Sequence, residues 1–385
     1  MRVKSLEARK IFATNSMPTI EVVLRTENSE VSASVPIGTS RGKREVEYLP
    51  AEQALLKFNL IRRHFRTNDF ENIKEVDETL RMIDSSPYFR QIGGNVALAI
   101  SSAFLKAFAA EAGKEVYEFL LKDKKAEMPR PLCNVVGGWG KTSDVQEYLL
   151  LPVHQKSFYR SIENISRAYF QIAEALKRYD FAFTYGKNIE SAWVTNLSMR
   201  KILEILMSVA NESLLKMGID FAASQRWDGQ FYKYLNANLR RHDQISFIEQ
   251  LTRTYPIIYI EDPVHEDDLD SFAVLTHRLQ NVIVCGDDLY TTDPDRISLG
   301  VSYKATNAAI IKPSQVGTIT GAIKAAEEAK ANGMKVIMSH RSGETEDNLI
   351  CHLAIGLGAD YVKFGISGER TSKINELLRI EQKIA

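Results

Sequence analysis

Cysteine, an excess of one charge and long apolar runs are all scarce in this 385-residue sequence. Only Cys133, Cys285 and Cys351 occur, an odd number without metal-site spacing. This argues against a disulfide framework and predicts buried, reduced thiols in a cytoplasmic protein. Basic and acidic residues both number 49, so no global field favours nucleic acid or an anionic membrane as a partner.

The longest apolar stretch, residues 96–110, is interrupted by Ser101, Ser102 and Lys106 and is too polar to span a membrane. No apolar segment follows residues 1–4, so we expect neither a secretion signal nor a membrane anchor. No internal repeat or low-complexity segment is apparent. The length exceeds that of one small domain, which leaves room for two.

The sequence does contain a recurring pattern, in which a short apolar run ends at one charged residue. These charged residues lie 41, 26, 25, 28 and 23 positions apart, which is about the length of one βα unit. In a parallel barrel the carboxyl ends of all strands open on one face, so the side chains should converge on one pocket. The six residues are Asp220, Glu261, Asp287, Lys312, His340 and Lys363.

The residue types in this set indicate metal-assisted acid–base chemistry. Three carboxylates around one point repel each other unless a divalent cation lies between them, and Mg²⁺ is the expected ion. Two lysines share the pocket, where burial and a nearby cation are expected to lower the ammonium pKa toward use as a base.

The preceding chain predicts a separate N-terminal domain. Strands over residues 2–13 and 19–35, with a turn at 27–29, precede helices at 51–65, 73–83 and 93–111. A charged, proline-containing segment at 122–131 is typical of a linker and is predicted to join the two domains. We therefore predict an N-terminal α+β domain of antiparallel sheet plus helices at 1–125 and a TIM-type (β/α)8 barrel domain at 132–385. Helices are expected at 158–178, 198–216 and 372–383.

Four motifs resemble the enolase family of phosphopyruvate hydratases, and the resemblance covers nearly the whole chain. They are IEDP at 260–263, GDDL at 286–289, IKPSQVGT at 311–318 and SHRSGETED at 339–347. The resemblance implies a magnesium-dependent lyase that removes the proton α to a carboxylate and converts 2-phosphoglycerate to phosphoenolpyruvate. It also implies a homodimer or higher oligomer, with an ion pair between Glu21 and Arg379 of different subunits.

Carried over residue by residue, the resemblance assigns a role to each matching position. Lys312 is the base, Gln146 binds the substrate, and Glu147 lies beside the leaving hydroxyl. Lys363 faces the substrate carboxylate. The metal ligands are Asp220, Glu261 and Asp287, with Ser40 on a second magnesium, and the phosphate and hydroxyl contacts are His340, Arg341 and Ser342.

The sequence departs from the family on the leaving-group side. The family's Gly-Asp-Glu-Gly-Gly loop, whose glutamate is the general acid, falls on residues 185–192. The simplest alignment puts Asn188 at the acid position, while a shifted loop would present Glu190 instead. Gly140 or Lys141 replaces a family histidine. In addition, residues 13–19 lack a family arginine and residues 365–370 form a shorter segment.

These departures leave two alternatives to a 2-phosphoglycerate lyase. One is a paralogue that acts on another phosphorylated or phosphonylated hydroxy acid. The other is a catalytically silent, enolase-like binding or assembly protein. Retained buried charges argue against the silent protein, because uncompensated buried charges are costly.

Overall fold

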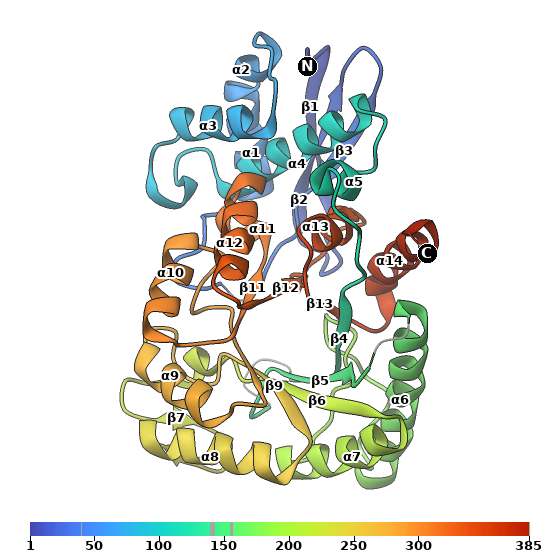
Figure 1. The fold of residues 1–385 in the computed structure, drawn as a ribbon, viewed down its shortest axis with the longest axis vertical. Coiled ribbons are helices and arrows are strands. Elements are labelled where there is room, and N and C mark those ends of the chain that lie inside the picture. The colour runs from blue at the N-terminus through green and yellow to red at the C-terminus, as the bar shows by residue number, and fades with distance from the viewer. Residues whose placement is uncertain (40, 139–142, 155–156, 385) are drawn as a thin grey trace.

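The computed structural model describes residues 1–39, 41–138, 143–154 and 157–384, and consists of a sheet with helices joined to a closed barrel (Figure 1). The sheet is antiparallel in the order β1-β2-β3, formed by Ser5–Phe12, Pro18–Arg25 and Glu30–Ser34. As predicted, a turn at 27–29 joins β2 and β3, closed by a hydrogen bond from Thr26 N to Ser29 O.

Helices cover one side of this sheet. Of these, α4 is buried on nearly all sides because it packs against β2, β3, α3 and the barrel helices α11 and α12. Helix α3 begins at Asn72, whose side chain accepts a hydrogen bond from Glu75 N. The helices of this part are α1 (Ala51–Ile61), α2 (Arg63–Arg66), α3 (Ile73–Ile83), α4 (Gly94–Glu111) and α5 (Val116–Leu121), with the short η1 (Pro87–Phe89).

Eight strands close the barrel in the order β10-β11-β12-β13-β4-β5-β6-β9. Alternate residues point inward, and a separate apolar cluster that includes Leu149, Tyr259 and Ile337 fills the interior. The strands are β4 (Arg130–Gly137), β5 (Glu147–Pro152), β6 (Leu215–Asp220), β9 (Ile257–Glu261), β10 (Ile283–Gly286), β11 (Ala308–Ile311), β12 (Lys335–Ser339) and β13 (Tyr361–Gly365).

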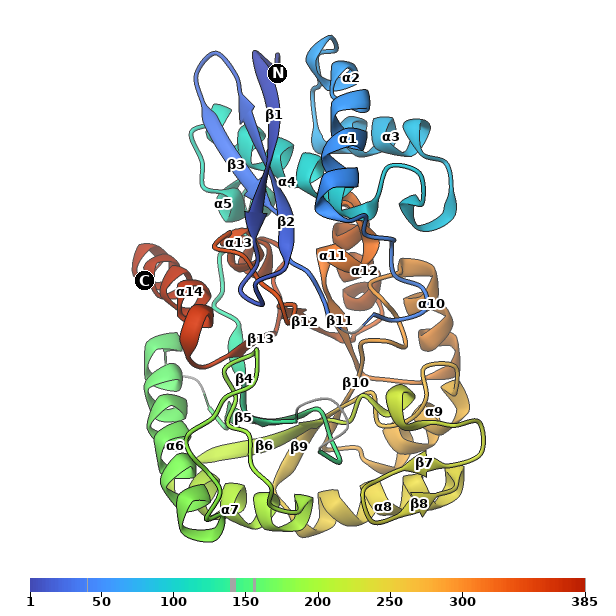
Figure 2. The ribbon, with the colours of Figure 1, turned by 180° about the vertical axis from the view of Figure 1, so that it is seen from behind.

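Helices surround the barrel, and α14 packs between α13 and α6 (Figure 2). They are α6 (Phe158–Tyr179), α7 (Met199–Glu212), α8 (Arg241–Thr254), α9 (Leu269–Arg278), α10 (Pro294–Tyr303), α11 (Pro313–Val316), α12 (Ile319–Ala331), α13 (Leu349–Gly356) and α14 (Thr371–Ile384). Short elements are η3 (Ala223–Arg226), β7 (Tyr232–Lys233), β8 (Asn238–Leu239) and η4 (Gly368–Arg370). Among the described helices, none is both long and apolar enough to cross a membrane.

The predicted fold class is confirmed, but two details differ. The barrel is not wholly parallel, because β5 runs antiparallel to both β4 and β6. No described helix lies between β4 and β5, and a parallel crossover would need one. The helix predicted at 198–216 ends at Glu212, since residues from Leu215 onward pair in β6.

Side chains of the N-terminal helices hold the barrel by hydrogen bonds. The Asp77 carboxylate of α3 accepts from the Thr320 backbone N and hydroxyl at 2.9 and 2.7 Å, and Ser101 Oγ of α4 accepts from Ile319 N at 2.9 Å. Lys106 of α4 donates to Asp347 at 2.8 Å. The first two contacts cap the amino end of α12, whose free N–H groups need acceptors.

Candidate active site

The strand-end residues converge as the pattern predicted. Asp220 ends β6, Glu261 ends β9, and Asp287, Lys312 and His340 directly follow β10, β11 and β12. Together with Lys363 of β13, all of these residues except Glu261 line a small polar pocket of about 30 Å³. Glu261 accepts a hydrogen bond from Lys363. A larger cavity of about 550 Å³ adjoins this pocket and shares Gln146, Glu190 and Ser342 with it.

Lys363 is the buried centre of the carboxylates. Its ammonium lies 2.7 Å from Glu147 Oε2, 2.8 Å from Asp220 Oδ2 and 2.8 Å from Glu261 Oε2. Burial opposes the charge on Lys363, but the three carboxylates outweigh it and raise the pKa well above its usual value. Lys363 is therefore a permanent cation here, suited to hold an anionic group and unsuited to take a proton.

Lys312 forms an ion pair with Asp287, whose other oxygen accepts from Gln315 Nε2 at 2.8 Å. Burial disfavours the charged ammonium, yet the Asp287 carboxylate prevails and the pKa of Lys312 is raised. The expected lowering of the pKa is therefore wrong for both Lys312 and Lys363. A cation that engaged Asp287 would remove this pairing and leave burial as the larger effect.

The carboxylate chemistry of the pocket fits a divalent cation. Among the described residues, the carboxylates of Glu147, Asp220 and Glu261 pair with the ammonium group of Lys363, and Asp287 pairs with Lys312. Burial is the largest cause that raises the pKa of Glu261 to about 8, and the nearby Asp220 adds to the rise.

Two sets of described side chains bring three potential metal-ligand atoms within 4.8 Å of one another. They are Glu147, Glu190 and His340, and Asp262, Asp287 and Asp288. The predicted trio of Asp220, Glu261 and Asp287 is not among them. Lys363 spans the first two carboxylates, whereas Lys312 and Gln315 engage the third. Either of the two described acidic clusters could hold a metal ion.

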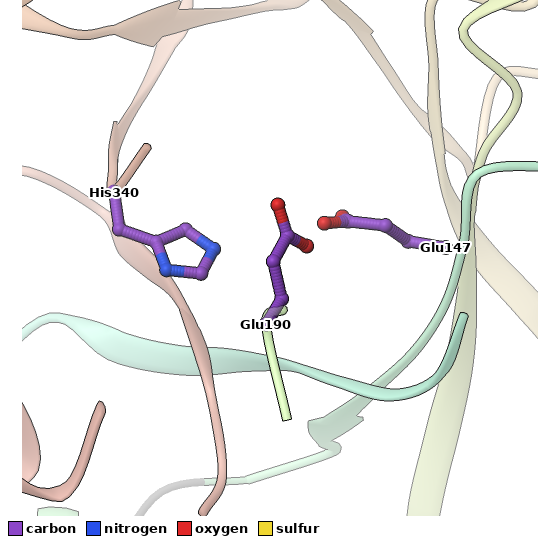
Figure 3. Close-up of side chains that lie close together, drawn as sticks. All are labelled: Glu147, Glu190 and His340. Atoms are coloured by element: carbon purple, nitrogen blue, oxygen red, sulfur yellow. The ribbon is translucent and has the colours of Figure 1, made fainter. Parts of the chain in front are cut away.

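The Glu190 carboxyl group lies between the His340 ring and Glu147 (Figure 3). Glu190 Oε2 accepts a hydrogen bond from Asn134 Nδ2 at 3.1 Å. Burial raises the pKa of Glu147 to about 8 against the effect of Lys363, and the neighbouring Glu190 adds to the rise. Burial and the cations Arg370 and Lys363 lower the pKa of His340 well below its usual value, so its ring is neutral.

Asn188 shapes the loop that carries Glu190. Its side-chain oxygen accepts hydrogen bonds from the backbone N of Glu190 and of Ala192, both at 3.0 Å. Its own backbone N donates to Ala192 O at 2.9 Å. The structure therefore places the Glu190 carboxyl group beside Glu147, as the shifted loop would present it. The side chain of Asn188 is occupied with closing the turn.

Arg341 and Ser342, two of the residues expected to contact phosphate, are bonded to the N-terminal part. Arg341 Nη1 donates to Glu45 Oε2 at 2.7 Å within a buried ion pair. Ser342 Oγ accepts from Thr39 N at 2.8 Å. Gln146 lines the pocket and its side-chain oxygen accepts from Gln225 at 3.3 Å. Ser40, Gly140 and Lys141 lie outside the described residues.

Sequence reasoning missed three positioning residues, Glu45, Asn134 and Asp262. Asp262 accepts hydrogen bonds from the backbone N of Asp287 and of Asp288, at 3.0 and 2.7 Å, and so fixes the turn after β10. Asn134 was detectable as an amide within the apolar run of β4. No local signal marked Glu45, because its partner Arg341 is distant in the sequence.

Comparison with known proteins matches both parts of the chain. A family model described as "Enolase, C-terminal TIM barrel domain" matches residues 125–385, and one described as "Enolase, N-terminal domain" matches residues 3–120. A protein named Enolase from Pyrobaculum aerophilum is 37% identical, covering 99% of this chain and 96% of its own length. Another of that name from Archaeoglobus fulgidus is also 37% identical, with 99% and 98% covered.

Proposed function

Because the chain belongs to the enolase family of carbon–oxygen lyases, we propose that it dehydrates 2-phosphoglycerate to phosphoenolpyruvate in a magnesium-dependent reaction. The observation that supports this most is the cluster of Glu190, Glu147 and His340, which have side-chain oxygen or nitrogen atoms within 4.8 Å of one another and line the same small pocket as Lys312. A base and an acid on opposite sides of one small pocket are what elimination of water requires.

For the metal, we assign Asp220, Glu261 and Asp287 as the ligands of the first Mg²⁺ and Ser40 as a ligand of a second. Bound there, the ions would stabilise the second negative charge that develops on the substrate carboxylate when its α-proton leaves. Mg²⁺ prefers such hard oxygen ligands over nitrogen or sulfur. In this assignment Glu147 and His340 belong with the proposed general acid Glu190 and are not metal ligands.

The chain's own side chains divide the work. Lys312, once it is released from Asp287 and has lost its ammonium proton to solvent, takes the α-proton of the substrate. The permanently charged Lys363 faces the substrate carboxylate. Glu190, held by Asn134, donates a proton to the leaving hydroxyl with Glu147 beside it. Substrate orientation is assigned to Gln146 and to the phosphate and hydroxyl contacts His340, Arg341 and Ser342.

Exchange of the substrate C2 hydrogen with solvent separates the two steps. Deuterium incorporation into unreacted 2-phosphoglycerate and product formation are measured together. Lys312→Ala should lose both, whereas Glu190→Gln should keep exchange and lose dehydration by about 10²–10⁴-fold. Lys335→Ala, a surface substitution, is the control. If native protein catalyses neither process at any Mg²⁺ concentration, the proposal fails and a silent binding protein becomes the better reading.

The paralogue is the second candidate. The cavity of about 550 Å³ beside the pocket is walled partly by Met17, Ile189 and Phe221, which gives room for a larger or less polar group on the leaving side. Ratios of kcat/KM for 2-phosphoglycerate and for related phosphorylated or phosphonylated hydroxy acids distinguish the two substrates.

For assembly and location, we propose a homodimer or a multiple of it in the cytoplasm. The free, buried cysteines Cys133, Cys285 and Cys351 support a reducing compartment. Within one chain Glu21 accepts from Arg9 Nε at 2.5 Å and Arg379 donates to Glu376 at 2.7 Å. The pair between Glu21 and Arg379 of different subunits therefore requires both to change partner. We retain 1–125 and 132–385 as the domain division.

A further inference from the structure

A second cleft is lined by residues of α3 and of the barrel helices α10, α11 and α12. Figure 1 shows these helices close together. Its volume is about 450 Å³, and it shares no described lining residue with the catalytic pocket. Gln315 separates the two spaces, because its side chain is bonded to Asp287 at 2.8 Å and to Thr292 at 2.6 Å on the catalytic side. The cleft is therefore a separate space within the range of small-molecule sites, about 300–1,000 Å³.

Basic side chains gather around this cleft. Arg44, Lys74, Arg81 and Lys324 line it. The Arg81 guanidinium lies over the Phe89 ring at 3.8 Å, so that its face is covered and its N–H edges remain for acceptors. Neither Arg81 nor Lys324 makes an ion pair or side-chain hydrogen bond with any residue that the structure describes. Two cations thus face the cleft without a hydrogen-bonding partner.

Two buried polar atoms of lining residues also lack partners in the described chain. Asp77 is 3% exposed, and while its Oδ2 accepts from Thr320, its Oδ1 accepts from nothing. Arg44 donates through Nη2 to Asp267 at 2.7 Å, but its buried Nη1 has no acceptor. Buried polar groups almost always have a partner, so each such orphan needs an explanation. Asp77 Oδ1 therefore needs a hydrogen-bond donor, and Arg44 Nη1 needs an acceptor.

We propose that this cleft binds a phosphorylated polyol, whose phosphate accepts from Arg44, Arg81 and Lys324 and whose hydroxyl donates to Asp77 Oδ1. The apolar wall of Pro87, Tyr88 and Val316 packs against the carbon chain. An anion without a hydroxyl group directed at Asp77 would leave Asp77 Oδ1 without a donor, and a neutral polyol would leave the cations without a charged acceptor. The combination of both groups in one ligand satisfies all of these atoms.

Calorimetric titration of the full-length protein with glycerol 3-phosphate, inorganic phosphate and glycerol tests this. The Arg341→Gln background is used because Arg341 belongs to the catalytic pocket. We expect one equivalent of glycerol 3-phosphate to bind at least tenfold more tightly than phosphate, and glycerol not to bind. Arg81→Gln with Lys324→Gln should weaken binding at least tenfold, whereas Lys114→Gln, an exposed lysine outside the cleft, should change nothing.

The Asp77→Asn variant tests the proposed contact with the ligand hydroxyl. It should remove the preference for glycerol 3-phosphate over phosphate without abolishing phosphate binding. If Arg341→Gln does not fold, the native protein should bind two equivalents, one of which the Arg81→Gln, Lys324→Gln pair removes. Absence of binding, or binding that the double substitution leaves unchanged, overturns the proposal. Equal affinity for phosphate and glycerol 3-phosphate overturns the assigned role of Asp77 and the polyol specificity.

Discussion

Glu147, the first residue of β5, lies directly opposite Asp220, the last residue of β6, in the antiparallel ladder between these strands. An antiparallel strand brings its amino end to the rim where the parallel strands bring their carboxyl ends. For this reason Glu147, which starts β5, contacts the same Lys363 ammonium as Asp220, which ends β6. The reversed β5 therefore adds a carboxylate to the pocket without an extra βα unit.

Asn188 should matter through the position of Glu190. Asn188→Asp keeps an oxygen that can accept from the Glu190 and Ala192 N–H groups, so dehydration should fall by less than about tenfold. Asn188→Ala removes that acceptor, and a displacement of the acid by about 1 Å can cost about 100-fold in rate. The measurement is kcat for dehydration beside C2 exchange. Equal loss of both processes in Asn188→Ala would contradict the positioning role.

Lys363→Met should strongly destabilise the metal-free protein. It leaves Glu147, Asp220 and Glu261 buried without their shared cation, and removal of one partner from a buried ion pair typically costs about 3–5 kcal/mol. Mg²⁺ should restore part of this free energy of unfolding, since it binds the folded state. Urea denaturation with and without Mg²⁺ measures both effects.

Lys335→Met is the matched control for Lys363→Met. Lys335 pairs with Asp360 at 3.4 Å on the surface, and a pair of this kind is worth about 0–1 kcal/mol. Comparable losses for the two variants would show that Lys363 does not hold the carboxylates together.

Asp77 should make stability depend on pH. Burial raises its pKa from 3.8 to about 6, against the hydrogen bonds from Thr320 and the charge of Arg81. The stability that the protonated carboxyl contributes is complete below about pH 3.8 and is lost as pH rises through 6. Asparagine cannot ionise, so the stability of Asp77→Asn relative to the native protein should rise by up to about 3 kcal/mol between pH 4 and pH 7.

Urea denaturation at several pH values between 4 and 7.5 measures this difference for Asp77→Asn. Glu78→Gln, which alters an exposed carboxylate on the same helix, is the control and should show a much smaller change with pH. A pH-independent difference for Asp77→Asn would mean that Asp77 titrates equally in the folded and unfolded states.

We expect sedimentation velocity to show a homodimer, or a multiple of it, whose size does not change with protein concentration. Glu21→Ala or Arg379→Ala should weaken association, and the double substitution should cost little more than either one, as expected for partners in one contact. If the two substitutions weaken association additively, Glu21 and Arg379 do not contact each other, but a dimer is not excluded. A monomer at every concentration would exclude the dimer itself.

The sequence alone determined the barrel and most of its rim. An apolar run that ends at a charged residue is a local pattern, because burial demands apolar side chains along the strand and permits a charge only where the strand meets the pocket. Asp220, Glu261, Asp287, Lys312 and His340 were found in this way. The three strands and most of the helices of the N-terminal part follow from the same periodicity.

Tertiary structure alone decided how these residues act on each other. The direction of β5 depends on which strands it pairs with, and the reach of Glu190 depends on how Asn188 closes a turn through backbone contacts. The pKa of Lys312 rises or falls with the distance to Asp287, and Arg341 finds Glu45 almost 300 positions away. Each of these depends on through-space distances, which local hydrophobic periodicity does not encode.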